Sequence, residues 1–139
     1  MISEITFKPY STFCKEEIVE LYKSVGWDVY LQDLDRLKQA FDHSLFILTA
    51  YQKQRLVGLI RVVGDGYTIL YIQDLLVHPD FARQGIGSRL LLRILGKYES
   101  VYQKILLTDD QAVCREFYEK MGFIKSSELG CLSYQWYQK

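Results

Sequence analysis

The sequence lacks any imbalance of charge. Lysine and arginine total 17, aspartate and glutamate also total 17, and the 139-residue chain therefore has a formal net charge of zero at pH 7. Proteins that hold nucleic acids or acidic lipid surfaces carry an excess of positive charge, because the phosphates they contact are anionic. The composition predicts no nucleic acid and no membrane as a partner, and it requires any bound anion to be held by a local site.

Cysteine and histidine are also scarce. The chain has three cysteines, at positions 14, 114 and 131, and only two histidines. An odd number of widely separated cysteines without a Cys-x-x-Cys spacing describes neither a disulfide framework nor a zinc site. We expect three reduced thiols and no metal.

Long apolar runs are missing as well. No stretch approaches the roughly 18 to 20 apolar residues that a membrane-spanning helix needs, and the first residues lack the basic-then-apolar layout of a signal peptide. These features predict a cytoplasmic protein. The length, with 49% hydrophobic residues, fits one domain over residues 1–139 with its own core.

The residues that are present follow two periodicities. Period two, rich in β-branched and aromatic residues, predicts strands at residues 5–7, 45–51, 55–63, 69–77 and 102–108, with strand-like stretches at Phe123 and residues 132–137. Spacings of three and four predict helices over residues 18–25, 33–45, 86–95 and 111–121. This order predicts an α/β fold with a central mixed sheet of about six to seven strands and about four flanking helices.

A glycine-containing turn, Arg83-Gln84-Gly85-Ile86-Gly87-Ser88, joins the long strand at 69–77 to the next helix. A P-loop needs four residues between its glycines and a following lysine, and neither is present. A dinucleotide fingerprint needs a third glycine at position 90, which is Leu90. The remaining interpretation is an anion held by main-chain amides at the helix N-terminus, with Arg83 adding a positive charge. The glycines alone leave a plain helix start without a ligand equally open.

Two motifs, in this order, resemble those of the GNAT acyltransferase superfamily over roughly residues 45–127. Residues 82–87 resemble its pyrophosphate motif, Gln/Arg-x-x-Gly-x-Gly/Ala, and Phe117 to Phe123 resemble the Phe-Tyr-x-x-x-Gly-Phe signature of its last helix. The sequence departs from the pattern at Ala82, where the family has Gln or Arg. Residues 21–27 and 58–66 further resemble a bacterial and plastid branch described as similar to arylalkylamine N-acetyltransferases.

The resemblance implies a GNAT fold in which acetyl-CoA, the co-substrate, lies where two parallel strands splay apart near Val77 and Thr108. The contacts it implies for acetyl-CoA are Leu75, Leu76, Val77, Arg83, Gln84, Gly85, Ile86, Gly87, Ser88, Gln111 and Tyr118. The main chain around Leu75 and Val77 would hold the pantetheine arm, and an amide at Leu75 or Leu76 would stabilise the thioester oxygen as it becomes an oxyanion.

Tyr118 is the first expected catalytic residue. By the resemblance, its role is to donate a proton to the departing CoA thiolate. Val113, Phe117 and Met121 are expected to face the core, and Tyr118 then points about 100° away from them. A phenol with a pKa near 10 is a weaker acid than a thiol near 8.5 by about 2 kcal/mol, and Tyr118 should therefore contribute without being essential.

Asp74 is the second expected catalytic residue. It is the best-placed carboxylate, and alternation puts it on one sheet face with Ile72 and Leu76. It is a candidate for the general base or for attraction of an ammonium group, and a purely structural pairing is an equally open alternative. Trp27 and Tyr30 are candidates for lining an acceptor pocket, with simple packing as the alternative.

The sequence as a whole predicts an acetyl-CoA-dependent N-acetyltransferase that acts directly on a primary amine of a small molecule. A protein or peptide acetyltransferase and a non-catalytic acyl-CoA-binding module remain as alternatives. A homodimer is compatible with the sequence, which does not specify the oligomeric state.

Overall fold

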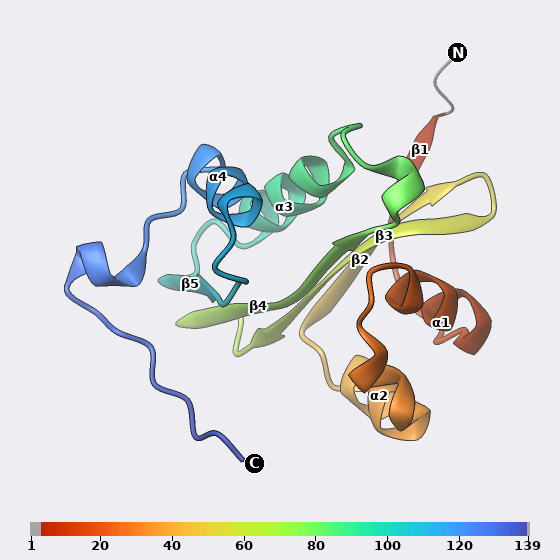
Figure 1. Ribbon diagram of the computed structural model, residues 1–139, viewed down its shortest axis with the longest axis horizontal. Coiled ribbons are helices and arrows are strands. Elements are labelled where there is room, and N and C mark those ends of the chain that lie inside the picture. The colour runs from red at the N-terminus through yellow and green to blue at the C-terminus, as the bar shows by residue number, and fades with distance from the viewer. Residues whose placement is uncertain (1–3, 139) are drawn as a thin grey trace. The chain divides into compact units, whose positions relative to one another are not determined.

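A five-stranded mixed sheet organises the larger part of the protein (Figure 1). The computed structural model describes residues 4–138, and the chain divides into two compact units, Met1–Leu107 and Thr108–Lys139, which we describe separately. The strands, in spatial order, are β1 (Ile5–Pro9), β2 (Phe46–Gln52), β3 (Arg55–Gly64), β4 (Ile69–Val77) and β5 (Gln103–Leu106). The first four pair antiparallel, and β5 pairs parallel to β4. β4 therefore lies inside the sheet, between β3 and β5.

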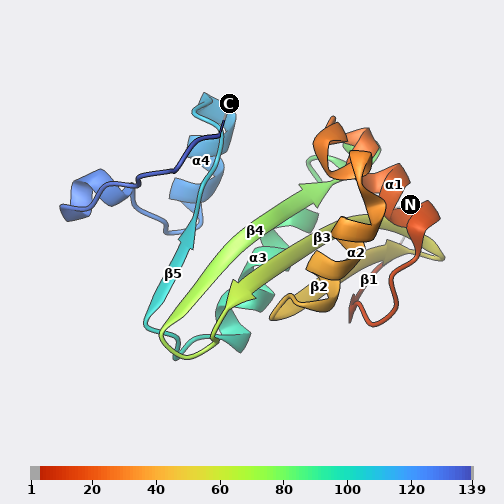
Figure 2. The ribbon, with the colours of Figure 1, turned by 90° about the horizontal axis from the view of Figure 1, so that it is seen from below.

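Helices cover both faces of this sheet (Figure 2). They are α1 (Lys15–Ser24), the 3-10 helix η1 (Asp28–Gln32), α2 (Leu34–Asp42), the 3-10 helix η2 (Pro79–Phe81) and α3 (Ile86–Lys97). Leu21, Leu37 and Leu59 belong to a buried cluster that packs α1 and α2 against one face. The opposite face carries α3, whose Lys97 lies over the ring of Phe46. Asp33 caps the N-terminus of α2, because its carboxylate accepts a hydrogen bond from the Arg36 N–H at 3.1 Å.

The second unit contains α4 (Ala112–Lys120) and the 3-10 helix η3 (Ser126–Leu129). The strands expected at Phe123 and residues 132–137 are not formed, and residues 4–138 contain five strands instead of six or seven. Leu132, Tyr134 and Trp136 alternate as in a strand but are 70%, 90% and 92% exposed. Alternation alone does not make a strand, because the backbone groups also need a paired neighbour.

A β-bulge interrupts β4 next to its polar residues. Arg61 pairs with Asp74 while Val62 pairs with Ile72, so that Gln73 has no partner on β3. One extra residue reverses the direction of the following side chains. Asp74 therefore shares a face with Leu76 but not with Ile72, contrary to the simple alternation expected from the sequence.

Among residues 4–138, no helix is both long and apolar enough to span a bilayer.

Candidate functional site

Strands β4 and β5 separate at the bulge. Their parallel pairing runs from Ile69 opposite Gln103 to Ile72 opposite Leu106 and stops there, although β4 continues to Val77. The last five residues of β4 therefore have a hydrogen-bonding edge that β5 does not cover. An uncovered edge of this kind can accept an extended ligand as an additional strand.

The direction of the main chain along this edge follows from one hydrogen bond. The N–H of His78 donates to the carbonyl of Val57 on β3 at 2.8 Å. Because N–H groups alternate between the two edges of a strand, Leu76 also points towards β3. Leu75 and Val77 then direct their N–H and C=O groups to the uncovered edge. Of the two amides considered for an oxyanion, Leu75 has the suitable direction and Leu76 does not.

The glycine turn follows β4 and η2 directly. Arg83 has a φ of +62° and Gly85 a φ of +77°, and both are exposed. Left-handed residues in such a turn direct successive N–H groups towards one point, which makes a concave anion site. Gly85 is the N-cap of α3, no side chain caps this helix end, and its first turn contains no acidic residue. The exposed amides and the positive end of the helix dipole are therefore available to an anion.

Gly58 determines where α3 begins relative to β4. It lies opposite Val77 on β3, and a Cβ atom placed on it would lie 3.1 Å from Cγ2 of Ile86 and 3.3 Å from Cδ1 of Leu90. The missing side chain thus allows the start of α3 to approach the sheet beside the end of β4. Ile86 itself is 1% exposed, so this residue can offer a ligand only its main chain.

Asp74 lies at the centre of a buried polar cluster. Its Oδ2 accepts hydrogen bonds from Nε of Arg61 at 2.7 Å and from the hydroxyl of Tyr22 at 2.9 Å, and its Oδ1 accepts one from the hydroxyl of Tyr30 at 2.8 Å. The side chains of Arg61 and Asp74 are 5% and 1% exposed. Burial alone lowers the pKa of Arg61, but the charge and hydrogen bond of Asp74 outweigh it, and the pKa of Arg61 is raised..

The two phenols of this cluster, Tyr22 and Tyr30, have raised pKa values and stay protonated. Burial, and then the negative charge of Asp74, raise the pKa of Tyr22 well above its ordinary value, and the pKa of Tyr30 is raised by the same two causes. The cluster is thus one ion pair with two neutral donors and no spare charge.

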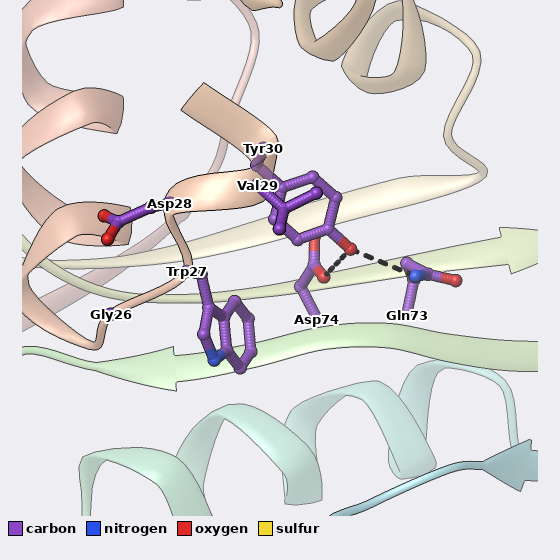
Figure 3. Close-up of a pocket in the computed structure, with 7 residues that line it drawn as sticks. All are labelled: Gly26, Trp27, Asp28, Val29, Tyr30, Gln73 and Asp74. Atoms are coloured by element: carbon purple, nitrogen blue, oxygen red, sulfur yellow. Dashed lines mark hydrogen bonds between the residues drawn. The ribbon is translucent and has the colours of Figure 1, made fainter. Parts of the chain in front are cut away.

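A cavity of about 310 Å³ opens beside this cluster (Figure 3). Its lining residues are Gly26, Trp27, Asp28, Val29, Tyr30, Gln73 and Asp74. The Tyr30 hydroxyl, which donates to Asp74, also accepts a hydrogen bond from Nε2 of Gln73 at 3.1 Å. Figure 3 shows that the carboxylate of Asp28 points away from Tyr30 and Asp74. Trp27 and Tyr30 both line this cavity, and both rings also pack on Tyr22.

Two of the expected site residues, Tyr118 and Gln111, belong to the second unit. Tyr118 lies on α4, where its ring makes edge contacts with Phe117 at 5.0 Å and Phe123 at 5.8 Å between centroids. Burial, with a smaller effect of Cys114, raises the pKa of Tyr118 to about 12. Gln111 is the exposed N-cap residue of this helix. Val113 was expected to face a core but is 70% exposed. No residue of α4 is fully buried.

Arg61, Tyr22 and Gln73 were not identified from the sequence. Arg61 and Asp74 are charges of opposite sign with apolar neighbours inside two strands, and that signal could have predicted a buried ion pair. No comparable signal marks Tyr22, which looks like any apolar position of α1. The bulge that frees Gln73 depends on the register between strands and leaves no local pattern.

Comparison with known proteins identifies the family. A family model described as the acetyltransferase (GNAT) domain matches residues 11–132. An uncharacterised N-acetyltransferase, ycf52, from Gracilaria tenuistipitata var. liui is 32% identical over 127 residues, which cover 87% of this chain and 67% of that protein. A GNAT family acetyltransferase from Streptococcus pneumoniae TIGR4 superposes with a TM-score of 0.87 at 38% identity, covering 98% of this chain and 99% of the other.

A more distant structure shares only the fold. The enzyme AAC(6')-Iy, in complex with the bisubstrate analogue CoA-S-monomethyl-acetylneamine, has a TM-score of 0.69 at 16% identity and covers 99% of each chain. The family model spans most of the sequence. The ycf52 relative and the Streptococcus structure, at 32% and 38% identity, are both named as acetyltransferases. The chain belongs to the GNAT family and is an acetyltransferase.

Proposed function

We propose that this acetyltransferase transfers the acetyl group of acetyl-CoA directly to a primary amine of a small molecule. The observation that carries the proposal is the sequence of three features along the end of one strand: the cavity at Gln73 and Asp74, the uncovered edge at Leu75 and Val77, and the glycine turn. An acceptor, a thioester and a pyrophosphate need sites in that order.

The pyrophosphate is assigned to the amides of the turn before α3. Arg83 adds the formal positive charge that Ala82 does not supply, and Gln84, Gly85 and residues 86–88 contribute through their main chain. A Cβ built on Gly85 has no neighbour within 4 Å, and the turn is therefore open to a ligand. Backbone amides at a helix N-terminus favour a negatively charged group. The pantetheine arm is assigned to the edge formed by Leu75 and Val77.

The reaction needs few groups from the protein. The amine nitrogen forms a bond to the thioester carbon, its proton leaves to water, the C–S bond breaks, and the CoA thiolate accepts a proton. The Leu75 N–H is directed to the edge where negative charge develops on the thioester oxygen, and it stabilises that oxyanion. Tyr118 is assigned as the donor to the thiolate.

The raised pKa of Tyr118 limits that role. At about 12 its hydroxyl stays protonated across the working pH range, but it is a weaker acid than a thiol with a pKa near 8.5. The transfer is uphill by about 5 kcal/mol, more than for an unperturbed phenol. Tyr118 is therefore expected to assist departure of the thiolate, with water as a competing donor.

The size of the cavity favours a small acceptor over a protein. A volume of 310 Å³ holds about ten water molecules, or a ligand of roughly ten non-hydrogen atoms. Trp27 and Tyr30 offer ring surface to the apolar body of such a ligand, while Gln73 offers polar atoms.

Release of CoA, followed with a thiol reagent, tests the proposal across simple amines, diamines, polyamines and lysine-containing peptides. Thermal denaturation with and without acetyl-CoA is measured in parallel. We expect acetyl-CoA to raise the melting temperature and at least one small primary amine to release CoA faster than the peptides.

Two results would contradict the proposal. Preference for the peptides over every small amine would assign a protein acceptor. Stabilisation by acetyl-CoA without release of CoA in the presence of any amine would indicate a module that binds the thioester without turnover.

A further inference from the structure

We propose that Asp74 is a positioning residue for the acceptor amine and acts through the hydroxyl of Tyr30, not as the base that removes the proton. The inference rests on the proposed function, because it assigns the cavity to the acceptor. It goes further by naming the groups that fix the wall of this cavity.

The contacts of Asp74 tie three elements to β4. Its carboxylate holds Arg61 of β3, Tyr22 of α1 and Tyr30 of η1, all within 2.9 Å. Among these partners only Tyr30 lines the cavity, where Gln73 donates to the same hydroxyl. The bond from Tyr30 to Asp74 therefore attaches the aromatic wall of the cavity to the strand that carries the uncovered edge (Figure 3).

The same contacts engage both carboxylate oxygens of Asp74 with donors of the protein. Its Oδ2 accepts from Arg61 and Tyr22 and its Oδ1 from Tyr30, and the guanidinium at 2.7 Å balances its charge, which leaves neither oxygen without a protein donor for the role of base. Tyr30 lines the cavity beside Asp74, and the raised pKa of this phenol opposes its ionisation as a relay.

Tyr22 and Tyr30 form a matched pair for testing this role. Each donates one hydrogen bond to Asp74, at 2.9 Å and 2.8 Å, and each ring packs on the other at 5.4 Å. Replacing either by phenylalanine keeps the ring and removes one bond to the same carboxylate. Tyr22 is fully buried and is absent from the lining of the cavity. A general loss of stability should appear in both variants, whereas a loss of acceptor positioning should appear only where Tyr30 is replaced.

The experiment compares wild type, Y30F, Y22F and D74N, each assayed well below its melting temperature with the best amine from the panel. For Y30F we expect the acceptor KM to rise about ten-fold, the effect of one hydrogen bond to a charged group, with the KM for acetyl-CoA unchanged. Y22F should keep both constants within about two-fold. D74N should raise the acceptor KM and keep the pH dependence of kcat, since no base has been removed.

Two kinetic results overturn the inference. If kcat of wild type rises with pH and D74N loses that rise, Asp74 is the base. If Y22F and Y30F change the acceptor KM equally, the cluster contributes only general stability.

Hydrogen–deuterium exchange of residues 27–32 gives a readout independent of turnover. Exchange should increase in Y30F and D74N but not in Y22F, and unchanged exchange in Y30F contradicts the positioning role. If wild type releases no CoA with any amine while the exchange pattern is as expected, the proposed function fails and the attachment of the wall stands.

Discussion

The buried ion pair between Arg61 and Asp74 allows a quantitative prediction about stability. Asp74→Asn keeps the size of the side chain, but it removes the negative charge and leaves the guanidinium of Arg61 buried without a counter-ion. The amide that replaces one oxygen would also face a donor, because Arg61 and Tyr22 share Oδ2 while Tyr30 binds Oδ1. Removing one partner of a buried pair costs about 3 to 5 kcal/mol. For a chain of this length, that loss lowers the melting temperature by about 10 to 20 °C.

Thermal denaturation followed by circular dichroism at pH 7 measures this effect. Glu20→Gln is the matched control, because Glu20 binds Arg55 at 3.0 Å with both side chains about half exposed. An exposed pair of this kind contributes less than about 1 kcal/mol, and the control should melt within about 4 °C of wild type. If D74N and E20Q melt at the same temperature, the buried pair described here does not form in solution.

Three further substitutions test the acetyl-CoA site. Gly85→Ala places a side chain on a residue with left-handed backbone, at a conformational cost of about 1 to 2 kcal/mol. Acetyl-CoA binding, measured by calorimetry, should weaken about ten-fold. The control Gly96→Ala, inside α3, should leave binding unchanged. Arg83→Ala should raise the KM for acetyl-CoA and reduce its salt dependence with little change in kcat; an unchanged KM contradicts a phosphate contact. Tyr118→Phe should lower kcat by about 100-fold or less. Burial raises the pKa of Tyr118 to about 12, so its contribution to stability is present below pH 10 and is lost as pH rises to 12. Wild type should therefore lose more unfolding free energy between pH 10 and pH 12 than Y118F. Equal losses in the two proteins would contradict the raised pKa.

Much of the fold could be predicted from local pattern. Runs rich in apolar and β-branched residues identified β2, β3 and β4, most of whose residues are buried, and spacings of three and four identified α1, α2 and α3, which bury one side. The glycine turn was predicted for the same local reason, since a residue with positive φ before a helix favours glycine.

What the sequence did not predict depends on contacts between distant residues. The bulge at Gln73 is a property of the register between β3 and β4, and it decides which face Asp74 occupies. Arg61 and Asp74 are 13 positions apart, and Tyr22 and Asp74 are 52 apart, so their pairing requires the folded sheet. For residues 132–137 the pattern indicated a strand, but the pattern contains no information on a pairing partner.

The central claim is direct transfer of an acetyl group from acetyl-CoA to a small amine. Incubation with [13C]acetyl-CoA and the best amine of the panel, followed by mass spectrometry of the small molecule and of the intact protein, measures where the label goes. We predict labelled N-acetyl amine in the same amount as released CoA, and an unlabelled protein with its cysteines at positions 14, 114 and 131 free. Label on the protein, or release of CoA without labelled amine, would contradict this account.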